Sequence, residues 1–353
     1  MSSLDRRAFL AGLLATPVLA ACGGGGDDEA ATTAPPTTAA TTTTTAPPPV
    51  QPLTGLPHQG DPALLARPAL VVKIDNADGE GRARPQAGLN QADIVYEERV
   101  EGSVTRLAAV FHSQDVDPVG PIRSFRSTDL HIVANLNRPL LAWSGANPTF
   151  AAMARNGPLI DVGFDAATDA YRRERSRRAP HNLMASTLAL RAHTPEGSTP
   201  PAPLFSYRDV GVAPVGGRPV SDVRINYGGG GGAAPVNYRL DAATGTWLRF
   251  QRDTPHVDEA GVQVQVENVV IMHVGYTSTG VVDSGGNPVP EAQLIGEGLL
   301  WVLTGGVLVE GRWSRPSEEA LATLTDAAGA AIALAPGRTW VALPEEGGAT
   351  VVA

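Results

Sequence analysis

Two arginines flank a serine in a segment whose residue types could bind an anion. The run GPIRSFRSTD, at residues 120–129, supplies Arg123, Ser124 and Arg126. Two guanidinium groups and a hydroxyl at the start of a predicted helix suit a phosphate or a carboxylate, because fork geometry and the backbone dipole both favour an anion there. Arg84, on a separate loop, is assigned to the same site. The alternative is that Arg123 pairs with a carboxylate of a neighbouring strand and only fixes the loop.

Three carboxylates earlier in the chain could act in acid/base chemistry or could orient the arginines. Asp75 ends an apolar run of strand length, a position where α/β sheets gather ligand groups. It could orient Arg84 or Arg123, or it could simply form an Asx turn as the chain leaves the sheet. Glu97 and Glu101 would share one face of a strand, and a glycosidase-like pair needs a separation of about 5 to 9.5 Å.

A turn after the two glutamates offers them a structural role instead. Gly102 and Ser103 are typical of a hairpin turn, which would bring Arg106 opposite Arg99 and diagonal to both glutamates. A cross-strand ion pair would then occupy the carboxylates. His181 could serve as a base, but no Gly-x-Ser-x-Gly elbow and no cysteine nucleophile accompanies it in the sequence.

Composition and spacing argue against several other classes of site. The seven histidines lack the i, i+4 spacing of a helical zinc site, so no metal is predicted. The glycine run at residues 228–232 lacks the Lys-Ser/Thr of a phosphate loop, and no cofactor is predicted. The formal net charge of -9 gives no support for nucleic-acid binding.

The first 22 residues are typical of an exported lipoprotein. Arg6 and Arg7 precede an apolar stretch that is too short to span a bilayer, a pattern that resembles a twin-arginine export signal. The sequence LAAC at residues 19–22 resembles a lipobox. Cys22 is the only cysteine in the chain, and we predict that acylation of its thiol ties the protein to the membrane. Ordinary Sec export is the alternative to the twin-arginine route.

A segment rich in Thr, Pro and Gly follows, at residues 23–52. It has no aromatic residue and almost no apolar residue larger than alanine, which predicts a disordered tether with a reach of roughly 30 Å. About 300 residues remain, enough for two domains. A proline-rich break at residues 194–203 predicts their boundary, which gives domains at 53–200 and 201–353.

The first predicted domain alternates strand-like and helical segments. Its strand-like runs lie at residues 69–74, 93–96, 105–111, 139–143 and 159–164, and its helical runs at 127–136, 148–155 and 182–192. This pattern predicts an α/β layered domain with a mixed sheet. The second half shows short apolar runs separated by turn signals and no helix after Leu204, which predicts a β-rich sheet or partly closed barrel. The predicted fold class is therefore α+β.

Several short motifs resemble those of the YerB-like lipoproteins. They are VVKIDN at 71–76, ARPQAGL at 83–89, ADIVYE at 92–97, VGPIRS at 119–124, APHNL at 179–183 and LAPGRTW at 334–340. The resemblance extends from Leu53 to Pro344. It implies an envelope lipoprotein with a domain of unknown function followed by a smaller β domain. It supplies no reaction and no catalytic residues.

Two functions are consistent with these patterns. The favoured one is non-catalytic: a membrane-anchored, extracytoplasmic lipoprotein that binds an anionic envelope ligand through the arginines and Ser124, or that acts as a scaffold for an envelope protein. The alternative is a cell-wall glycan or peptidoglycan hydrolase or transferase with Asp75 or Glu97 as acid or base. A cleft lined by arginines with every carboxylate paired would favour binding. Carboxylates converging in an open cleft would favour the enzyme.

Overall fold

The computed structural model describes most of the chain beyond the predicted export signal. The described residues are 48–77, 83–228, 234–283 and 285–352. They belong to one compact unit. The predicted signal peptide, Cys22 and the tether as far as residue 47 lie outside the described residues.

The folded body begins slightly before the predicted end of the tether. Val50 forms an isolated bridge with Pro57, and the His58 amide donates to the Pro49 carbonyl at 2.7 Å. Residues 48–52 therefore take part in the fold, because they pair with the chain that follows them and do not lead freely into it.

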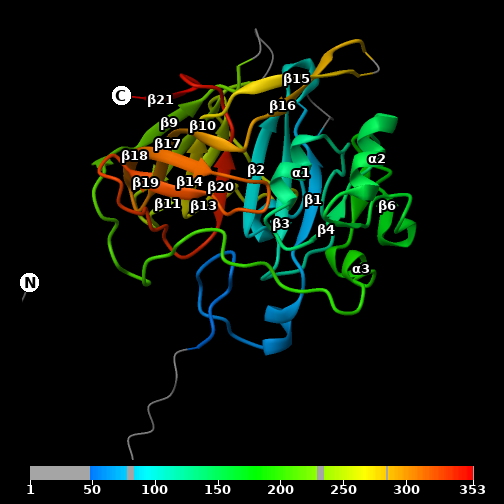
Figure 1. The fold of residues 1–353 in the computed structure, drawn as a ribbon, viewed down its shortest axis with the longest axis horizontal. Coiled ribbons are helices and arrows are strands. Elements are labelled where there is room, and N and C mark those ends of the chain that lie inside the picture. Colours follow the sequence, from blue (N-terminus) through cyan, green and yellow to red (C-terminus); the bar gives the residue numbers. More distant parts are fainter. Residues whose placement is uncertain (1–47, 78–82, 229–233, 284, 353) are drawn as a thin grey trace, which may run out of the picture. The chain divides into compact units, whose positions relative to one another are not determined.

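An eleven-stranded mixed sheet runs through both halves of the described chain (Figure 1). Its strand order is β19-β18-β17-β14-β20-β2-β3-β1-β4-β5, with β8 beside β18. The first half contributes β1 Leu70–Asp75, β2 Ile94–Arg99, β3 Thr105–Phe111, β4 Leu140–Ala142 and β5 Ile160–Asp161. The second half contributes β8 Arg218–Pro219, β14 Asn268–Met272, β17 Gly296–Thr304, β18 Val307–Arg315, β19 Thr323–Asp326 and β20 Thr339–Ala342.

Strand β20 joins the two halves. It lies between β2 and β14 and is parallel to both, with Trp340 in register with Val95 on one side and Val269 on the other. All four of its residues are buried, as a strand covered on both faces requires. The predicted halves therefore share one sheet, and the boundary near residue 200 divides the sequence without dividing the sheet.

The second half also forms a separate six-stranded sheet. Its order is β12-β11-β10-β9-β21, with β13 beside β11. These strands are β9 Asp222–Ile225, β10 Val236–Asp241, β11 Thr246–Gln251, β12 Thr254–Pro255, β13 Gln265–Val266 and β21 Ala349–Val351. Two hairpins complete the strands, formed by β6 Tyr171–Arg173 with β7 Leu183–Ala185 and by β15 Tyr276–Val282 with β16 Pro288–Ala292. The second half is β-rich, as predicted, and the fold class is α+β.

The α-helices are short and all lie in the first half of the described chain. They are α1 Thr128–Val133, α2 Pro148–Asn156 and α3 Thr187–Arg191, and 3-10 helices occur at Pro62–Ala66, Leu89–Gln91, Glu101–Ser103 and Thr168–Ala170. The prediction of one helix over residues 182–192 was wrong in its first part. Leu183–Ala185 pairs with β6 as a buried strand, and the Ser186 side chain then caps α3 by accepting from the Ala189 amide at 3.5 Å.

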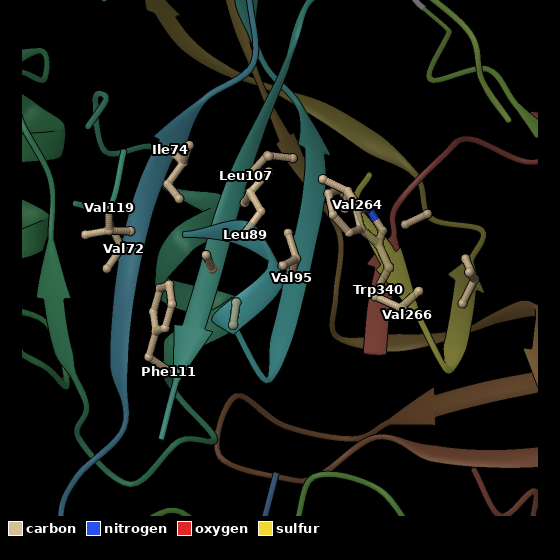
Figure 2. Packing of buried hydrophobic residues seen from close by; sticks show 14 of the residues in the cluster. Val72, Ile74, Leu89, Val95, Leu107, Phe111, Val119, Val264, Val266 and Trp340 are labelled. Atoms are coloured by element: carbon tan, nitrogen blue, oxygen red, sulfur yellow. The ribbon is translucent and has the colours of Figure 1, made fainter. Parts of the chain in front are cut away.

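Buried apolar side chains pack on both faces of the large sheet. Val72 and Ile74 belong to one cluster, whereas Val71, which precedes them on β1, belongs to a second, as the alternation of a strand requires. Figure 2 shows the first cluster reaching from Val72 to Trp340 and Val266. The core is therefore continuous across the two halves. It includes residues of β1 and β3, the strands that carry Asp75 and Arg106.

Candidate functional site

A cleft of about 720 Å³ lies beside the end of β1 and the start of β3. These two strand ends are adjacent because Asp75 of β1 is in register with Arg106 of β3. Its charged and hydroxyl-bearing lining consists of Glu101, Arg106, Arg123, Ser124, Arg126, His181 and Asp283. The structure thus brings together three of the four residues that sequence assigned to an anion site, and it adds Arg106 and His181.

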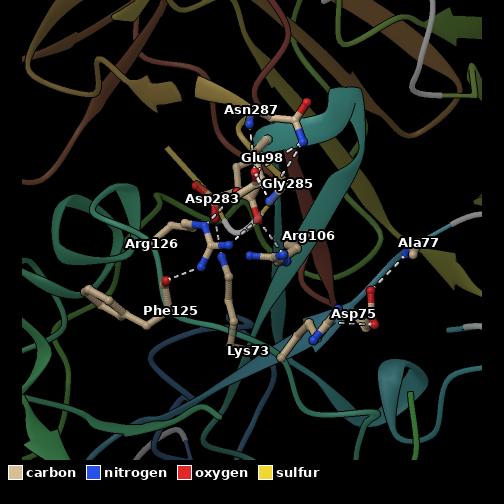
Figure 3. A network of polar contacts seen from close by, with 12 residues as sticks. Lys73, Asp75, Ala77, Glu98, Arg106, Phe125, Arg126, Asp283, Gly285 and Asn287 are labelled. Atoms are coloured by element: carbon tan, nitrogen blue, oxygen red, sulfur yellow. Dashed lines mark hydrogen bonds and ion pairs between the residues drawn. The ribbon is translucent and has the colours of Figure 1, made fainter. Parts of the chain in front are cut away.

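Glu101 binds two of the arginines of the cleft. Arg126 donates to its carboxylate through Nε at 2.7 Å and through Nη2, and Arg106 Nη2 donates at 2.8 Å. Burial alone would raise the pKa of Glu101, but the hydrogen bonds from Arg126 and the charge of Arg106 outweigh it and lower the pKa to about 2. Figure 3 shows Arg106 and Arg126 side by side in this network. The Glu101 carboxylate is therefore ionised and accepts hydrogen bonds from both arginines.

Arg106 keeps one donor group unused. Its Nη1 is buried and has no hydrogen-bond partner within the described part of the chain. The residue is only 7% exposed. A buried guanidinium N–H without an acceptor costs about 1–3 kcal/mol or more, so an oxygen that reaches it would be bound favourably. A ligand oxygen or a water would satisfy this donor, because the described neighbouring residues supply no acceptor.

Asp75 positions both Arg123 and His181. Its Oδ2 lies 3.0 Å from Arg123 Nε and 2.6 Å from His181 Nδ1, and its Oδ1 accepts from the Ala77 amide at 3.0 Å. The Asx turn and the orientation of Arg123, which sequence offered as alternatives, are therefore both present. The structural alternative for Arg123, pairing with a carboxylate of a neighbouring strand, is also realised through Asp75. The Arg123 side chain is nevertheless 26% exposed toward the cleft.

A buried triad supports the arginine segment from the side of the sheet. Lys73 Nζ donates to Glu98 and, at 2.6 Å, to Asp129, and these three side chains are wholly buried. Asp129 also accepts from the Arg126 backbone amide at 2.8 Å. Burial raises the pKa of Glu98, and Lys73 partly offsets this. Sequence reasoning missed this role, although Lys73 is the only lysine of the chain and lies inside an apolar strand.

The helix start contributes less to the site than sequence predicted. Neither Ser127 nor Thr128 caps α1 with its side chain, because Ser127 Oγ is buried without a partner and Thr128 Oγ1 accepts from the Ala292 amide at 3.0 Å. The helix has only six residues. The start of α1 therefore does not provide the anion site that sequence placed there.

Arg84 lies outside the cleft. Its Nη1 donates to Asn76 Oδ1 at 2.9 Å and to Gln251 Oε1 at 3.2 Å, which turns the guanidinium toward β11. Burial, followed by the charge of Arg249, lowers the pKa of Arg84 to about 10. The structure therefore does not bring Arg84 together with Arg123 and Ser124.

Glu97 is fully buried in a second polar cluster. Arg249 Nη2 donates to both of its oxygens, at 3.0 and 3.1 Å, and Trp340 Nε1 donates at 3.1 Å. Asn76 and Thr105 donate to Oε1 at 3.1 and 2.8 Å. This carboxylate does not line the cleft. It connects β2 to β11 and β20.

The register of the hairpin after Glu97 differs from the predicted one. Arg106 lies opposite Glu98 and Arg99 opposite Thr105, one residue away from the predicted pairing of Arg106 with Arg99. The reason is the connection, a 3-10 turn at Glu101–Ser103 closed by the hydrogen bond from the Val100 amide to the Val104 carbonyl, where a tight two-residue turn was expected. The predicted ion pair of Arg106 forms with Glu101 alone.

The carboxylates around the cleft are occupied. Asp75 pairs with Arg123, and Glu101 pairs with Arg106 and Arg126, whereas Asp283 at the rim accepts from the amides of Gly285 and Asn287 at 2.8 Å. Arg106, Arg123 and Arg126 thus face three carboxylates, those of Asp75, Glu101 and Asp283. Because these charges balance, a second negative charge on a ligand would meet no surplus positive charge, which favours a singly charged anion over a dianion.

The fold and the site together define an α+β protein whose two halves share one sheet and whose arginine cleft lies at a strand end of the first half. The chain belongs to the family described as protein of unknown function (DUF3048). The model of its N-terminal domain matches residues 53–199, and that of its C-terminal domain matches residues 223–341.

Two comparisons, one by sequence and one by structure and both with YerB of Bacillus subtilis, place this family membership in context. The chain is 26% identical over 298 residues to a Bacillus subtilis (strain 168) protein named "Putative lipoprotein YerB", covering 82% of this chain and 84% of that protein. It also resembles the crystal structure of YerB protein from Bacillus subtilis, with a TM-score of 0.72 and 23% identity over 86% of this chain and 99% of that one. The structural likeness shows the fold. The relative's name indicates a membrane-associated lipoprotein, and within the described residues no helix is long and apolar enough to cross a membrane.

Proposed function

We propose that this protein is a lipoprotein of the cell envelope that binds a singly charged anionic ligand in its arginine cleft. The observation that carries the proposal is that Arg106, Arg123 and Arg126 together line a cleft large enough for a ligand, while Arg106 keeps a buried Nη1 donor unused. Ser124 and Asn147 add neutral polar groups to the lining. The proposal of ligand binding holds whether or not a reaction follows in the cleft.

Anchoring is proposed to rest on acylation of Cys22, followed by the tether at residues 23–52. The lipobox-like sequence and the lipoprotein relative support this assignment. Export would place the body on the extracytoplasmic face, where anionic ligands of the envelope are available. The alternative of a glycan hydrolase receives no support from the geometry, because Asp75 and Glu97 are both buried and paired.

The binding proposal is tested with diethyl phosphate, a singly charged probe, by calorimetric titration of the soluble body. Arg123→Ala should weaken binding by about 1.5 to 3 kcal/mol, the range for a hydrogen bond to a charged group. Arg312→Ala is the matched control, because Arg312 forms an exposed pair with Glu297 away from the cleft. It should leave the affinity unchanged.

Thermal melting separates a binding role of Arg123 from a structural one. After loss of Arg123, the Asp75 carboxylate still accepts from His181 and Ala77, so the melting midpoint of the free protein should fall little. The probe should raise the midpoint of the wild type and not that of Arg123→Ala, because a ligand stabilises only the folded state that binds it. A large drop for the free variant, together with no probe-induced shift in the wild type, would refute the binding role.

A further inference from the structure

His181 presents a second nitrogen, Nε2, that is not engaged by any described residue. Its Nδ1 lies 2.6 Å from Asp75 Oδ2, and an ionised carboxylate can only accept, so Nδ1 carries the proton. In the neutral ring Nε2 is then a free acceptor. No hydrogen bond to Nε2 occurs within the described ranges, and the ring borders the cleft with 14% of its side chain exposed.

The same carboxylate oxygen joins this ring to the anion site. Asp75 Oδ2 contacts both His181 Nδ1 and Arg123 Nε, at 2.6 and 3.0 Å. The imidazole and the guanidinium are therefore neighbours, held by one group at the end of a fully buried strand. An anion bound by Arg123 would lie within the cleft that the imidazole borders.

From this arrangement we propose that the cleft hydrolyses phosphodiesters, with His181 as the general base and Asp75 as its positioning residue. The proposal rests on the binding function proposed above and names its substrate class. A phosphodiester carries the single charge that suits three arginines facing three carboxylates. A carboxylate ligand would bind equally well, but it has no leaving group, and a base oriented by an aspartate would have nothing to act on.

The reaction balances without a further reactant. Nε2 of His181 takes a proton from water as the water oxygen attacks phosphorus, and the bond from phosphorus to one ester oxygen breaks. The departing oxygen takes that proton from the imidazolium, which leaves a phosphomonoester and an alcohol. Arg123 and the free Nη1 of Arg106 stabilise the negative charge on the non-bridging oxygens. Asp75 fixes the tautomer and the orientation of the ring.

The test measures release of nitrophenol from bis(p-nitrophenyl) phosphate by the soluble body. His181→Asn keeps a donor near the position of Nδ1 and removes the base, so turnover should fall at least about 100-fold, the lower end for general-base catalysis. Binding of diethyl phosphate should change less than threefold. Arg312→Ala serves again as the control and should hydrolyse the diester at the rate of the wild type.

Two further measurements keep the result interpretable. Should His181→Asn fail to fold, His181→Gly is assayed with added imidazole, which restores turnover only if the ring acts as a base. Asp75→Asn should lower kcat about tenfold or more without raising KM, because Arg123 keeps its charge while the ring loses its orientation. A rise in KM with kcat unchanged would overturn the positioning role of Asp75.

The outcomes distinguish this proposal from the binding function. Binding of diethyl phosphate by the wild type without turnover of the diester would overturn the catalytic proposal alone. Failure to bind would overturn both. Competition by sn-glycero-3-phosphoglycerol in solution or by phosphatidylglycerol vesicles would tell a free diester from a lipid headgroup.

Discussion

The three arginines of the cleft differ in how freely they can meet a ligand. Arg126 donates to Glu101 through two nitrogens and to the Phe125 carbonyl, at 2.7 Å, through the third, so it chiefly holds the site together. Arg106 keeps Nη1 free, and Arg123 is tied to Asp75 by one contact while a quarter of its side chain is exposed. In the proposed binding mode Arg123 is therefore the first contact of an incoming anion, and Arg106 is the deeper one.

His112, a buried histidine away from the cleft, should make the free energy of unfolding depend on pH. Burial, and then the charges of Arg67 and Arg191, lowers the pKa of His112 from 6.5 to about 4. The unfolded chain takes up this proton near pH 6.5 and the folded chain only near pH 4. The contribution of neutral His112 to the free energy of unfolding is therefore complete above pH 6.5 and is lost as the pH falls to 4. The total loss is about 3 kcal/mol.

The prediction is checked by urea unfolding of the wild type and His112→Gln between pH 7.5 and 4.5. The glutamine can still donate to the Arg67 carbonyl, which His112 Nε2 contacts at 3.1 Å, but it has no charge to gain. The difference in unfolding free energy between the two proteins should narrow by roughly 2 to 3 kcal/mol as the pH falls. Parallel curves over this range would contradict the assignment.

At the scale of elements, local patterns predicted the parts of the fold that local forces determine. Strands β1 and β3 and helix α2 lie close to their predicted ranges, because apolar runs and the Asn147-Pro148 cap are local signals. The pairing of β2 with β20 joins residues about 245 positions apart, and an apolar run such as TWVA fits many strands equally well. Sequence therefore could not select this partner.

The same limit applies to the site. Arg123, Ser124 and Arg126 could be predicted because they stand together in one segment, but the contact of Asp75 with His181 spans 106 positions. The register of Arg106 was wrong by one residue, and in a strand such a slip moves every side chain to the opposite face. Long-range pairing, and with it the contact of Asp75 with the proposed base, had to come from the structure.

The buried pair of Glu97 and Arg249 offers a test of how β2 is held to β11. Both side chains are wholly buried, so Glu97→Leu leaves an uncompensated guanidinium and should destabilise the protein by about 3–5 kcal/mol. The double variant Glu97→Leu with Arg249→Met removes both charges and should regain at least about 1 kcal/mol over the single variant.

Denaturant unfolding of the wild type, of the single variants Glu97→Leu and Arg249→Met and of the double variant measures these differences. The result also bears on the chemistry, because a structural Glu97 predicts losses of stability and no specific loss of ligand binding in the variant that stays folded. If the loss of unfolding free energy in the double variant equals the sum of the losses in the two single variants, the ion pair itself does not stabilise the contact.

For the whole molecule, the shared sheet makes the two halves depend on each other. The β2–β20 pairing and the core cluster from Val72 to Trp340 both cross the predicted boundary, whereas the chain connecting the halves at residues 195–197 is exposed. A cut in this connection removes no strand pairing. The halves should therefore behave as one folding unit even when the chain between them is broken.

The final prediction combines this continuity with the proposed anchor. A specific protease site is inserted after Glu196 in the full-length lipoprotein, and membranes are sedimented after cleavage. The C-terminal fragment should remain with the membrane, because β20 stays paired with β2 and only the N-terminal fragment carries Cys22. Urea should release it by breaking the sheet. Release of the C-terminal fragment by cleavage alone would show that the halves are independent domains. Cys22→Ser should leave an uncleaved precursor that takes up no radioactive fatty acid, and label persisting on the serine variant would refute the lipid anchor.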